Sequence, residues 1–406
     1  MIRRQDLVQT VQNQRESVFS NTDTFPRQLL GIIDLHHPQY ADIITGIRRC
    51  GKSTLVEQLM QRYADDSFYV NFDTPALFGF TVENFRTLDD GIRQSGAHYL
   101  FFDEIQVVSG WESYVRSLID AHFKVVVTGS NASMLSRELG TRMTGRHISR
   151  RLMPFSYSEF IGYKNLQAGE ESLIQYMQLG GFPAYLQTER RELLSDLAVD
   201  VLYRDILVRY GLRDEQSLKN LMTFLMGNVG NLITGNKLTQ TIRVKSAKTV
   251  LDYMSYMENA YLLFSIPRFS FSYRSQLVNP KKVYCVDLGL QAILSPSFSA
   301  DTGHRLENLV FIELYRRGCE TYYYSNNGHE CDFVVCRNQK PEMLIQVCEE
   351  VLVDNQDREY GGLIAAMKEL QVEKGLILTL NQTDTAVVEG IQIKTLPLWK
   401  WIITNS

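Results

Sequence analysis

Short apolar runs alternate with longer amphipathic stretches over residues 39–160. The runs are Ala41–Thr45, Ser67–Asp73, His98–Glu104 and Phe123–Asn131, and each one ends in polar or small residues. Short, continuous apolar runs with polar ends are typical of parallel strands that are buried on both faces. The segments between them show the spacing of amphipathic helices. This alternation predicts a three-layer α/β fold built on a parallel sheet.

A glycine-rich loop follows the first apolar run and precedes a predicted helix. Glycines at both ends let the backbone curl, so that successive N–H groups and the helix N-terminus face phosphate oxygens. Lys52 adds a positive charge, and Ser53 supplies the hydroxyl that a phosphate-bound Mg²⁺ needs. The alternative is a glycine-rich turn that arose by chance. The position of the loop between a predicted strand and a predicted helix favours the phosphate-binding interpretation. The expected nucleotide-binding residues are Gly46, Ile47, Arg48, Arg49, Cys50, Gly51, Lys52, Ser53 and Thr54.

A second acidic strand end completes the expected site. The run from His98 ends in Asp103 and Glu104, which places two carboxylates at the C-terminal edge of the sheet, where ligands bind in open α/β folds. Asp103 is expected to hold Mg²⁺ through its water shell. Glu104 points differently and is expected to act as general base on the attacking water. In a chain without the glycine-rich loop, an acidic pair after an apolar run would indicate only that the strand ends and a connecting segment begins.

The fourth run ends in small and amide side chains. Asn131, and after it Ser130, is the candidate for contacting the γ-phosphate or the attacking water. Both residue types also favour helix N-caps, so a structural role stays open.

Composition limits the partners of the chain. Its 406 residues are 44% hydrophobic and 22% charged, with a formal net charge of −4. The small net charge gives no overall electrostatic attraction to nucleic acid or to a membrane, so such a partner would have to bind a local patch of charge. The apolar runs are far shorter than the roughly 20 residues of a membrane helix. The N-terminus lacks a signal-peptide pattern, and the six cysteines are scattered, so we expect a cytoplasmic protein without disulfides or a zinc site.

The motifs resemble the AAA+ superfamily, and specifically the bacterial and archaeal AAA-domain proteins fused to a C-terminal domain of unknown function. The resemblance covers nearly the whole chain. It implies that ATP is bound and hydrolysed with Mg²⁺ by Lys52, Ser53, Asp103 and Glu104. Its carriers are the segments 46–54, 101–106, 128–135, 145–146 with 152–160, and Gly180–Pro183.

The resemblance also implies an arginine that neutralises the leaving phosphate, supplied in cis or by a neighbouring subunit. Arg142 and Arg146 lie beyond the fourth strand, where the family places such residues. Arg137, Arg150 and Arg151 crowd the same stretch, so the choice among them stays open. AAA+ relatives often form rings, and a homo-oligomer and a monomer are both compatible with the sequence.

The middle of the chain is rich in helix formers and resembles a helical lid followed by a winged helix. Ser217–Val229, Lys237–Ile242 and Ser246–Glu258 are expected helices, and Ala260–Pro267 is the expected wing. The third helix begins near Lys245 and Lys248, which could meet phosphate, but it also carries Asp252 and Glu258. A lid, a protein-binding part and a DNA-binding part are therefore all compatible with this segment.

The C-terminal part resembles the restriction-endonuclease-like fold. Its expected elements are the strand Val283–Val286, the helix Glu307–Arg316 and the strands Glu320–Tyr324, Cys331–Cys336 and Met343–Val347.

Glu307 and Asp332 stand where the early acids of such a nuclease would be. Gln346-Val347-Cys348 replaces the expected Glu-x-Lys, which removes a metal ligand and a lysine. The resemblance therefore implies an inactive nuclease scaffold used for binding. Pairing of the two acids with Arg305 or Arg337 is the structural alternative.

Three domains are expected: a P-loop ATPase at 1–165, a helical lid and winged helix at 166–275, and a nuclease-like domain at 276–406. The leading hypothesis is ATP hydrolysis that moves the last two domains and changes how they hold a protein or DNA partner. A slow ATP-dependent binding switch and an ATP-gated nuclease are the alternatives.

Overall fold

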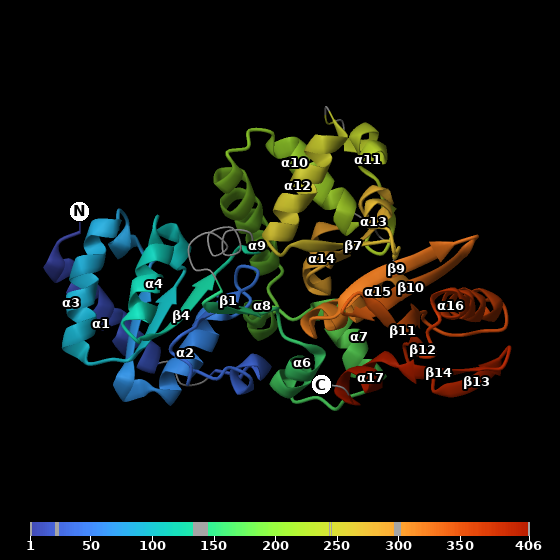
Figure 1. Ribbon diagram of the computed structural model, residues 1–406, viewed down its shortest axis with the longest axis horizontal. Helices are drawn as coiled ribbons and strands as arrows, with labels where there is room; N and C mark the ends of the chain where they lie inside the picture. Colours follow the sequence, from blue (N-terminus) through green and yellow to red (C-terminus); the bar gives the residue numbers. More distant parts are fainter. Residues whose placement is uncertain are drawn as a thin grey trace. The chain divides into compact units, whose positions relative to one another are not determined.

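The computed structural model describes residues 2–20, 24–132, 145–242, 244, 246–295 and 302–404. The chain divides into two compact units. Unit 1 comprises Met1–Met153 with Asn259–Tyr261, and unit 2 comprises Pro154–Glu258 with Leu262–Ser406. The ribbon of the chain is shown in Figure 1.

Unit 1 is built on a five-stranded sheet in which every neighbouring pair is parallel, in the order β2-β3-β4-β1-β5. The predicted strands are confirmed, and β4 lies between β1 and β3. The C-terminal ends of β1, β3 and β4 therefore meet at the centre of one edge. The strands are β1 (Ala41–Thr45), β2 (Ser67–Asn71), β3 (Tyr99–Asp103), β4 (Lys124–Gly129) and β5 (His147–Arg151).

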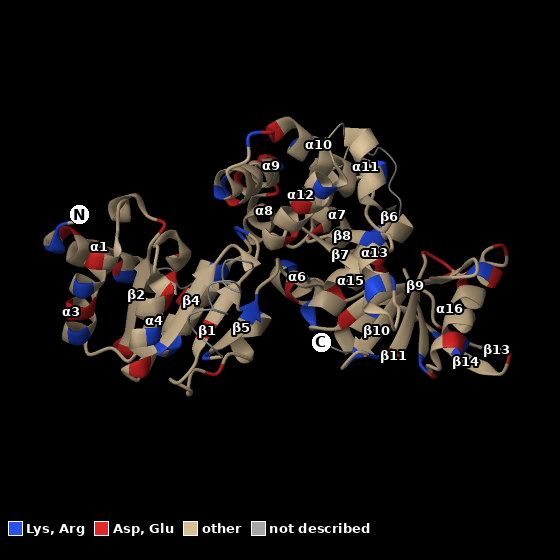
Figure 2. Cartoon of the chain, turned by 45° about the horizontal axis from the view of Figure 1, so that its top comes forward, with Lys and Arg blue, Asp and Glu red and all other residues tan. Residues whose placement is uncertain are grey.

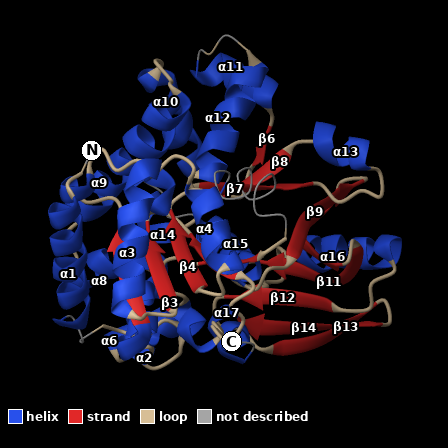
Figure 3. Cartoon of the chain, turned by 60° about the vertical axis from the view of Figure 1, so that its left-hand side comes forward, coloured by secondary structure: helices blue, strands red, loops and turns tan. Residues whose placement is uncertain are grey.

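Helices cover both faces of this sheet, as the three-layer prediction required. Strand residues such as Val70, Phe102 and Val127 form one apolar core with α1 (Arg4–Ser20), α3 (Phe85–Ser95) and α4 (Trp111–Asp120). Alternate strand residues, such as Phe101, point the other way. The buried Leu55 and Leu59 of α2 (Lys52–Arg62) lie outside the first core and contribute to the second face. Helices and strands are distinguished by colour in Figure 3.

Unit 2 begins with helices, of which α10 to α12 match the three helices predicted for the winged helix to within a few residues. Assigning them to a winged helix stays a prediction. The helices are α6 (Tyr157–Lys164), α7 (Glu170–Leu179), α8 (Pro183–Thr188), α9 (Glu192–Asp200), the π-helical segment Val201–Val208, α10 (Glu215–Met226), α11 (Gly235–Ile242) and α12 (Ala247–Asn259).

A small antiparallel sheet follows, in the order β6-β8-β7. The strand predicted at Val283–Val286 belongs to this sheet and does not pair with the later strands. The elements are β6 (Leu232–Ile233), β7 (Leu263–Pro267), α13 (Tyr273–Val278), β8 (Lys281–Cys285) and α14 (Leu288–Leu294).

The last part is a mixed six-stranded sheet in the order β13-β14-β12-β11-β10-β9. Helix α16 packs against β10 and β11. The elements are α15 (Thr302–Arg316), β9 (Glu320–Asn326), β10 (His329–Arg337), β11 (Lys340–Val347), α16 (Gln356–Leu370), β12 (Gly375–Thr379), β13 (Asp384–Val388), β14 (Ile391–Pro397) and α17 (Leu398–Thr404).

The Gly180–Pro183 motif has a structural role in unit 2. Gly180 has φ 72°, and a Cβ there would overlap the carboxyl group of Asp287. The buried Asp287 accepts the Gly181 N–H at 2.6 Å and caps α14 through the Leu290 N–H at 2.9 Å. Burial raises the pKa of Asp287 to about 6. One carboxylate thus joins the loop after α7 to the start of α14.

Charges and hydropathy of the described chain agree with the composition. Figure 2 shows acidic and basic residues interspersed along the helices of each unit. Among the described helices, none combines the length and apolar character needed to cross a bilayer. All six cysteines are free thiols.

Replacing Asp287 by Ala should destabilise the protein. Two buried N–H groups would lose their acceptor, so we expect the free energy of unfolding to fall by about 2–4 kcal/mol. Urea unfolding followed by tryptophan fluorescence measures this change. Asp196→Ala, at an exposed position on α9, is the matched control and should shift stability by less than about 0.5 kcal/mol. Equal effects of the two variants would contradict the role given to Asp287.

Candidate active site

The loop between β1 and α2 has the backbone of an anion cradle. Gly46 passes so close to Leu152 that a Cβ would overlap its carbonyl oxygen. Arg49 and Gly51 have φ 62° and 99°, the left-handed backbone that is found in anion-binding loops. Helix α2 then begins at Lys52 without a side-chain cap on its first N–H groups. These groups can therefore receive phosphate oxygens.

Lys52 lies inside this loop. Its side chain is buried, and Nζ donates to the carbonyl oxygens of Gly46 and Ile47 at 3.2 Å each. The same atom is 3.6 Å from Oε1 of Glu104. The ammonium thus lies between the loop backbone and the second acid of the predicted pair.

Asp103 is the centre of a buried hydrogen-bond network. Its Oδ2 accepts the Ser53 hydroxyl at 2.6 Å, and its Oδ1 accepts the hydroxyl of Thr128. Tyr69 and Asn71, both on β2, also donate to Oδ2, at 3.3 and 3.4 Å. Burial first, and the neighbouring Glu104 second, raise the pKa of Asp103 above its ordinary value. The carboxylate therefore links the ends of three strands to the start of α2.

Glu104 is held in an unusual backbone conformation with φ 51°. Its N–H donates to the Thr128 hydroxyl at 3.0 Å, and its carboxylate accepts the amide of Gln106. Thr128 therefore positions both acids at once, since its hydroxyl donates to one and accepts from the other. Left-handed backbone at a non-glycine residue costs about 1–3 kcal/mol and is typical of functional sites.

These residues fit a magnesium-bound nucleotide. Ser53 and Asp103 already lie within hydrogen-bond distance, so a hydroxyl and a carboxylate oxygen are available to one hard cation. The loop N–H groups and Lys52 would hold phosphate oxygens. When bound, Mg²⁺ would offset the negative charge that the buried Asp103 and the phosphates bring together.

Of the other residues predicted for this site, some lie at the edge of the sheet that carries the glycine-rich loop and others do not. Ser130 and Asn131 are buried directly after β4, at the edge that carries the glycine-rich loop. Arg146 lies at the opposite edge, because its carbonyl accepts the N–H of Ala41 at the start of β1. Its half-exposed guanidinium pairs with Asp120. Arg142 lies outside the described residues.

Two further residues support the loop and were missed from the sequence. The buried Arg27 donates to the carbonyl oxygens of Cys50 and Met153, each at 2.7 Å. The Tyr261 hydroxyl donates to the Thr45 hydroxyl at 2.7 Å, at the last residue before the loop. No motif surrounds either residue, so only the folded chain reveals these contacts.

The acids predicted in the C-terminal part do come together, in unit 2. Their common partner is Lys282, 2.8 Å from each, and neither Arg305 nor Arg337. Arg305 instead donates to the Met177 carbonyl.

The two residues that replace the expected Glu-x-Lys lie in different surroundings. Gln346 lines the same pocket as Glu307 and Asp332. Cys348 packs in the apolar core of the six-stranded sheet.

Thr128→Val should weaken the site from within. The variant removes a buried hydroxyl that serves Asp103 and Glu104, so we expect a loss of about 1–3 kcal/mol in the free energy of unfolding. Denaturant titration without nucleotide checks this value. Thr128→Ser keeps the hydroxyl and should retain most of that stability. A valine variant as stable as wild type would show that the network contributes nothing.

Two family models match parts of the chain. An AAA domain matches residues 39–161, and a domain of unknown function (DUF8612) matches residues 170–301. The structure of CDC6P from Pyrobaculum aerophilum is 15% identical, with a TM-score of 0.29, over 72% of this chain and 98% of that one.

Two relatives match almost the entire chain. An uncharacterized protein of Methanocaldococcus jannaschii is 29% identical over 402 residues, covering 90% of this chain and 89% of its own. An uncharacterized protein of Haemophilus influenzae is 30% identical over 386 residues, covering 89% and 94%. The chain therefore belongs to the same protein family as the Haemophilus influenzae relative, and its first unit has the AAA+ P-loop α/β fold.

Proposed function

We propose that this protein is a Mg²⁺-dependent ATPase. The observation that carries the proposal is the contact of Ser53 and Thr128 with the buried Asp103, beside Lys52 and Glu104. A site that only bound nucleotide would need the loop and the metal ligands, but no second acid. Glu104 supplies that second acid, one residue after the metal-binding carboxylate.

Each residue has a separate role in the proposed reaction. The loop N–H groups and Lys52 hold the phosphates, while Ser53 and Asp103 hold Mg²⁺. Glu104 accepts a proton from the attacking water. Asn131, which is 1% exposed at the tip of β4, contacts the γ-phosphate or that water.

We further propose that hydrolysis changes how the helical segment 166–275 and the C-terminal segment 276–406 hold a protein or DNA partner. The element order from α10 to β8 supports a winged helix. Exposed Lys248 on α12 is available to phosphate, but Asp252 shares that helix, so a protein partner is compatible as well. Free thiols at all six cysteines are in keeping with a cytoplasmic location.

Glu104→Gln should separate binding from hydrolysis. The amide keeps the shape of the side chain but cannot accept the proton, so we expect phosphate release to fall about 10²–10⁴-fold. ATP affinity, measured with a fluorescent analogue, should stay within a few-fold. Lys52→Ala is the matched control and should lose both properties.

The alternatives give different results in the same assays. Equal inactivity of wild type and Glu104→Gln, across Mg²⁺ concentrations and with DNA present, would support a binding switch in which turnover is incidental. DNA cleavage that disappears in Asp332→Ala would support an ATP-gated nuclease.

Arg146 is proposed to act on the site of a second subunit. It lies at the far edge of the sheet from its own loop, and β1 alone spans about 13 Å. We therefore expect turnover per molecule to rise with protein concentration, and Arg146→Ala to abolish that rise. Phosphate release across a dilution series measures this. A rate independent of concentration, unchanged by Arg146→Ala, would remove Arg146 from the reaction.

A further inference from the structure

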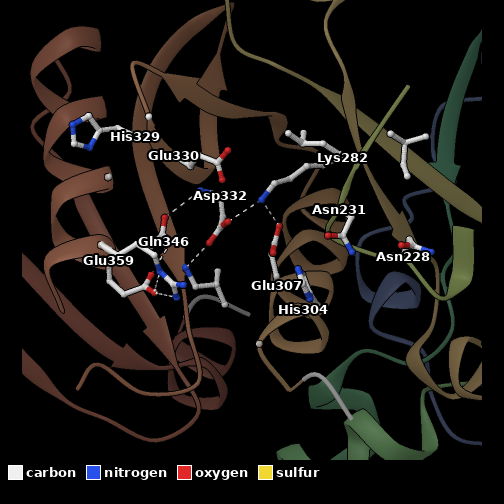
Figure 4. Close-up of a pocket in the computed structure, with 18 of the residues that line it drawn as sticks. Asn228, Asn231, Lys282, His304, Glu307, His329, Glu330, Asp332, Gln346 and Glu359 are labelled. Atoms are coloured by element: carbon white, nitrogen blue, oxygen red, sulfur yellow. Dashed lines mark hydrogen bonds and ion pairs between the residues drawn. The ribbon is translucent and has the colours of Figure 1, made fainter. Parts of the chain in front are cut away.

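Unit 2 contains a polar pocket of about 890 Å³ that the ATPase reaction does not use. Its walls come from α15, β10, β11 and α16 on one side and from the segment around β6 and α11 on the other. Glu307, Asp332 and Lys282 lie at its floor, and Figure 4 shows Lys282 reaching between the two acids.

The Lys282 ammonium bridges the two carboxylates. Nζ is 2.8 Å from Oε1 of Glu307 and 2.8 Å from Oδ1 of Asp332. All three residues are less than 10% exposed, so water contributes little to their solvation. Burial lowers the pKa of Lys282, but the two carboxylates outweigh it and raise that pKa overall. The two carboxylates therefore favour the charged form of Lys282.

The two acids and Gln346 have further hydrogen-bond partners in the pocket. Glu307 also accepts the Tyr284 hydroxyl at 2.7 Å, and Asp332 accepts the Val347 N–H at 2.9 Å. Gln346 accepts the Asp332 N–H and donates to Glu359 at 2.8 Å. Among the described residues, no three His, Cys, Asp or Glu side chains are grouped as a metal site.

We propose that Lys282 is a built-in replacement for a divalent cation in this pocket. Two buried carboxylates on different elements repel one another unless a cation lies between them. A divalent metal could fill that position with oxygen ligands, and the ammonium fills it here with two hydrogen bonds. The pocket is therefore complete without metal, and removing the ammonium creates a site for Mg²⁺ or Mn²⁺.

The position of Lys282 in the fold gives this replacement a second consequence. Lys282 is on β8 of the three-stranded sheet, Asp332 is on β10 of the six-stranded sheet, and Glu307 is on α15. A freely exchanging metal ion would let these elements separate when it left. The Lys282 ammonium is covalently attached to the chain, so it holds these elements together whatever the metal concentration.

The test compares wild type, Lys282→Met and Lys282→Met/Asp332→Asn as full-length chains without nucleotide. In EDTA, Lys282→Met should unfold about 6–15 °C below wild type, because two buried carboxylates lose their counter-charge. Adding 1 mM Mn²⁺ should restore at least half of that loss in Lys282→Met and nothing in the double variant. Mn²⁺ binding, followed by electron paramagnetic resonance, should show one more site in Lys282→Met than in the other two proteins.

Two results would overturn the proposal. The first is a Lys282→Met variant that gains neither a Mn²⁺ site nor stability from Mn²⁺, because the carboxylates would then not form a cation site. The second is a Mn²⁺ site in wild type that is lost in Asp332→Asn, because the pocket would then bind metal beside Lys282. The comparison of wild type with Asp332→Asn needs no Lys282 variant, so it tests the proposal even if Lys282→Met does not fold. Equal Mn²⁺ binding by these two proteins supports the proposal.

Discussion

The buried carboxylate of Asp103 is the group on which the organisation of unit 1 depends. A charge that is fully removed from water must be compensated by donors, and here the donors come from β2, β4 and the first turn of α2. Satisfying this one carboxylate therefore aligns the ends of three strands with the helix that begins at Lys52. The nucleotide site is a consequence of the same arrangement, because those strand ends and that helix form its walls.

The two units compensate buried acids in different ways, and the difference matches their chemistry. Around Asp103 the nearest donors are neutral hydroxyls, which can rotate the O–H group and can also act as acceptors. Around Glu307 and Asp332 the donor is a charged lysine that no metal ion replaces without leaving an unpaired ammonium. The two environments therefore differ, since neutral hydroxyls surround the acid of unit 1 and an ammonium bridges the acids of unit 2.

The sequence predicted the parts of the fold that depend on local pattern. Four of the five strands of unit 1, the glycine-rich loop and α2 follow from apolar runs and turn residues that are adjacent in the chain. Strand β5 and helix α1 were missed. His147–Arg151 is an edge strand with a polar, partly exposed pattern, and α1 is mostly polar with few buried residues. Elements of that kind are stabilised by the sheet or core that they contact, so their own pattern carries little signal.

For the candidate site, the sequence alone determined which residue types were available and at which strand ends they lie: Lys52 and Ser53 after β1, Asp103 and Glu104 at the end of β3. Only the tertiary structure decided that Thr128 serves both acids, that Arg146 lies at the far edge of its own sheet, and that Lys282 joins Glu307 to Asp332. The physical reason is the range of the interactions. The glycine-rich loop and the residues at each strand end are determined by neighbours in the chain. A hydrogen bond between buried groups depends instead on which strands become neighbours in space.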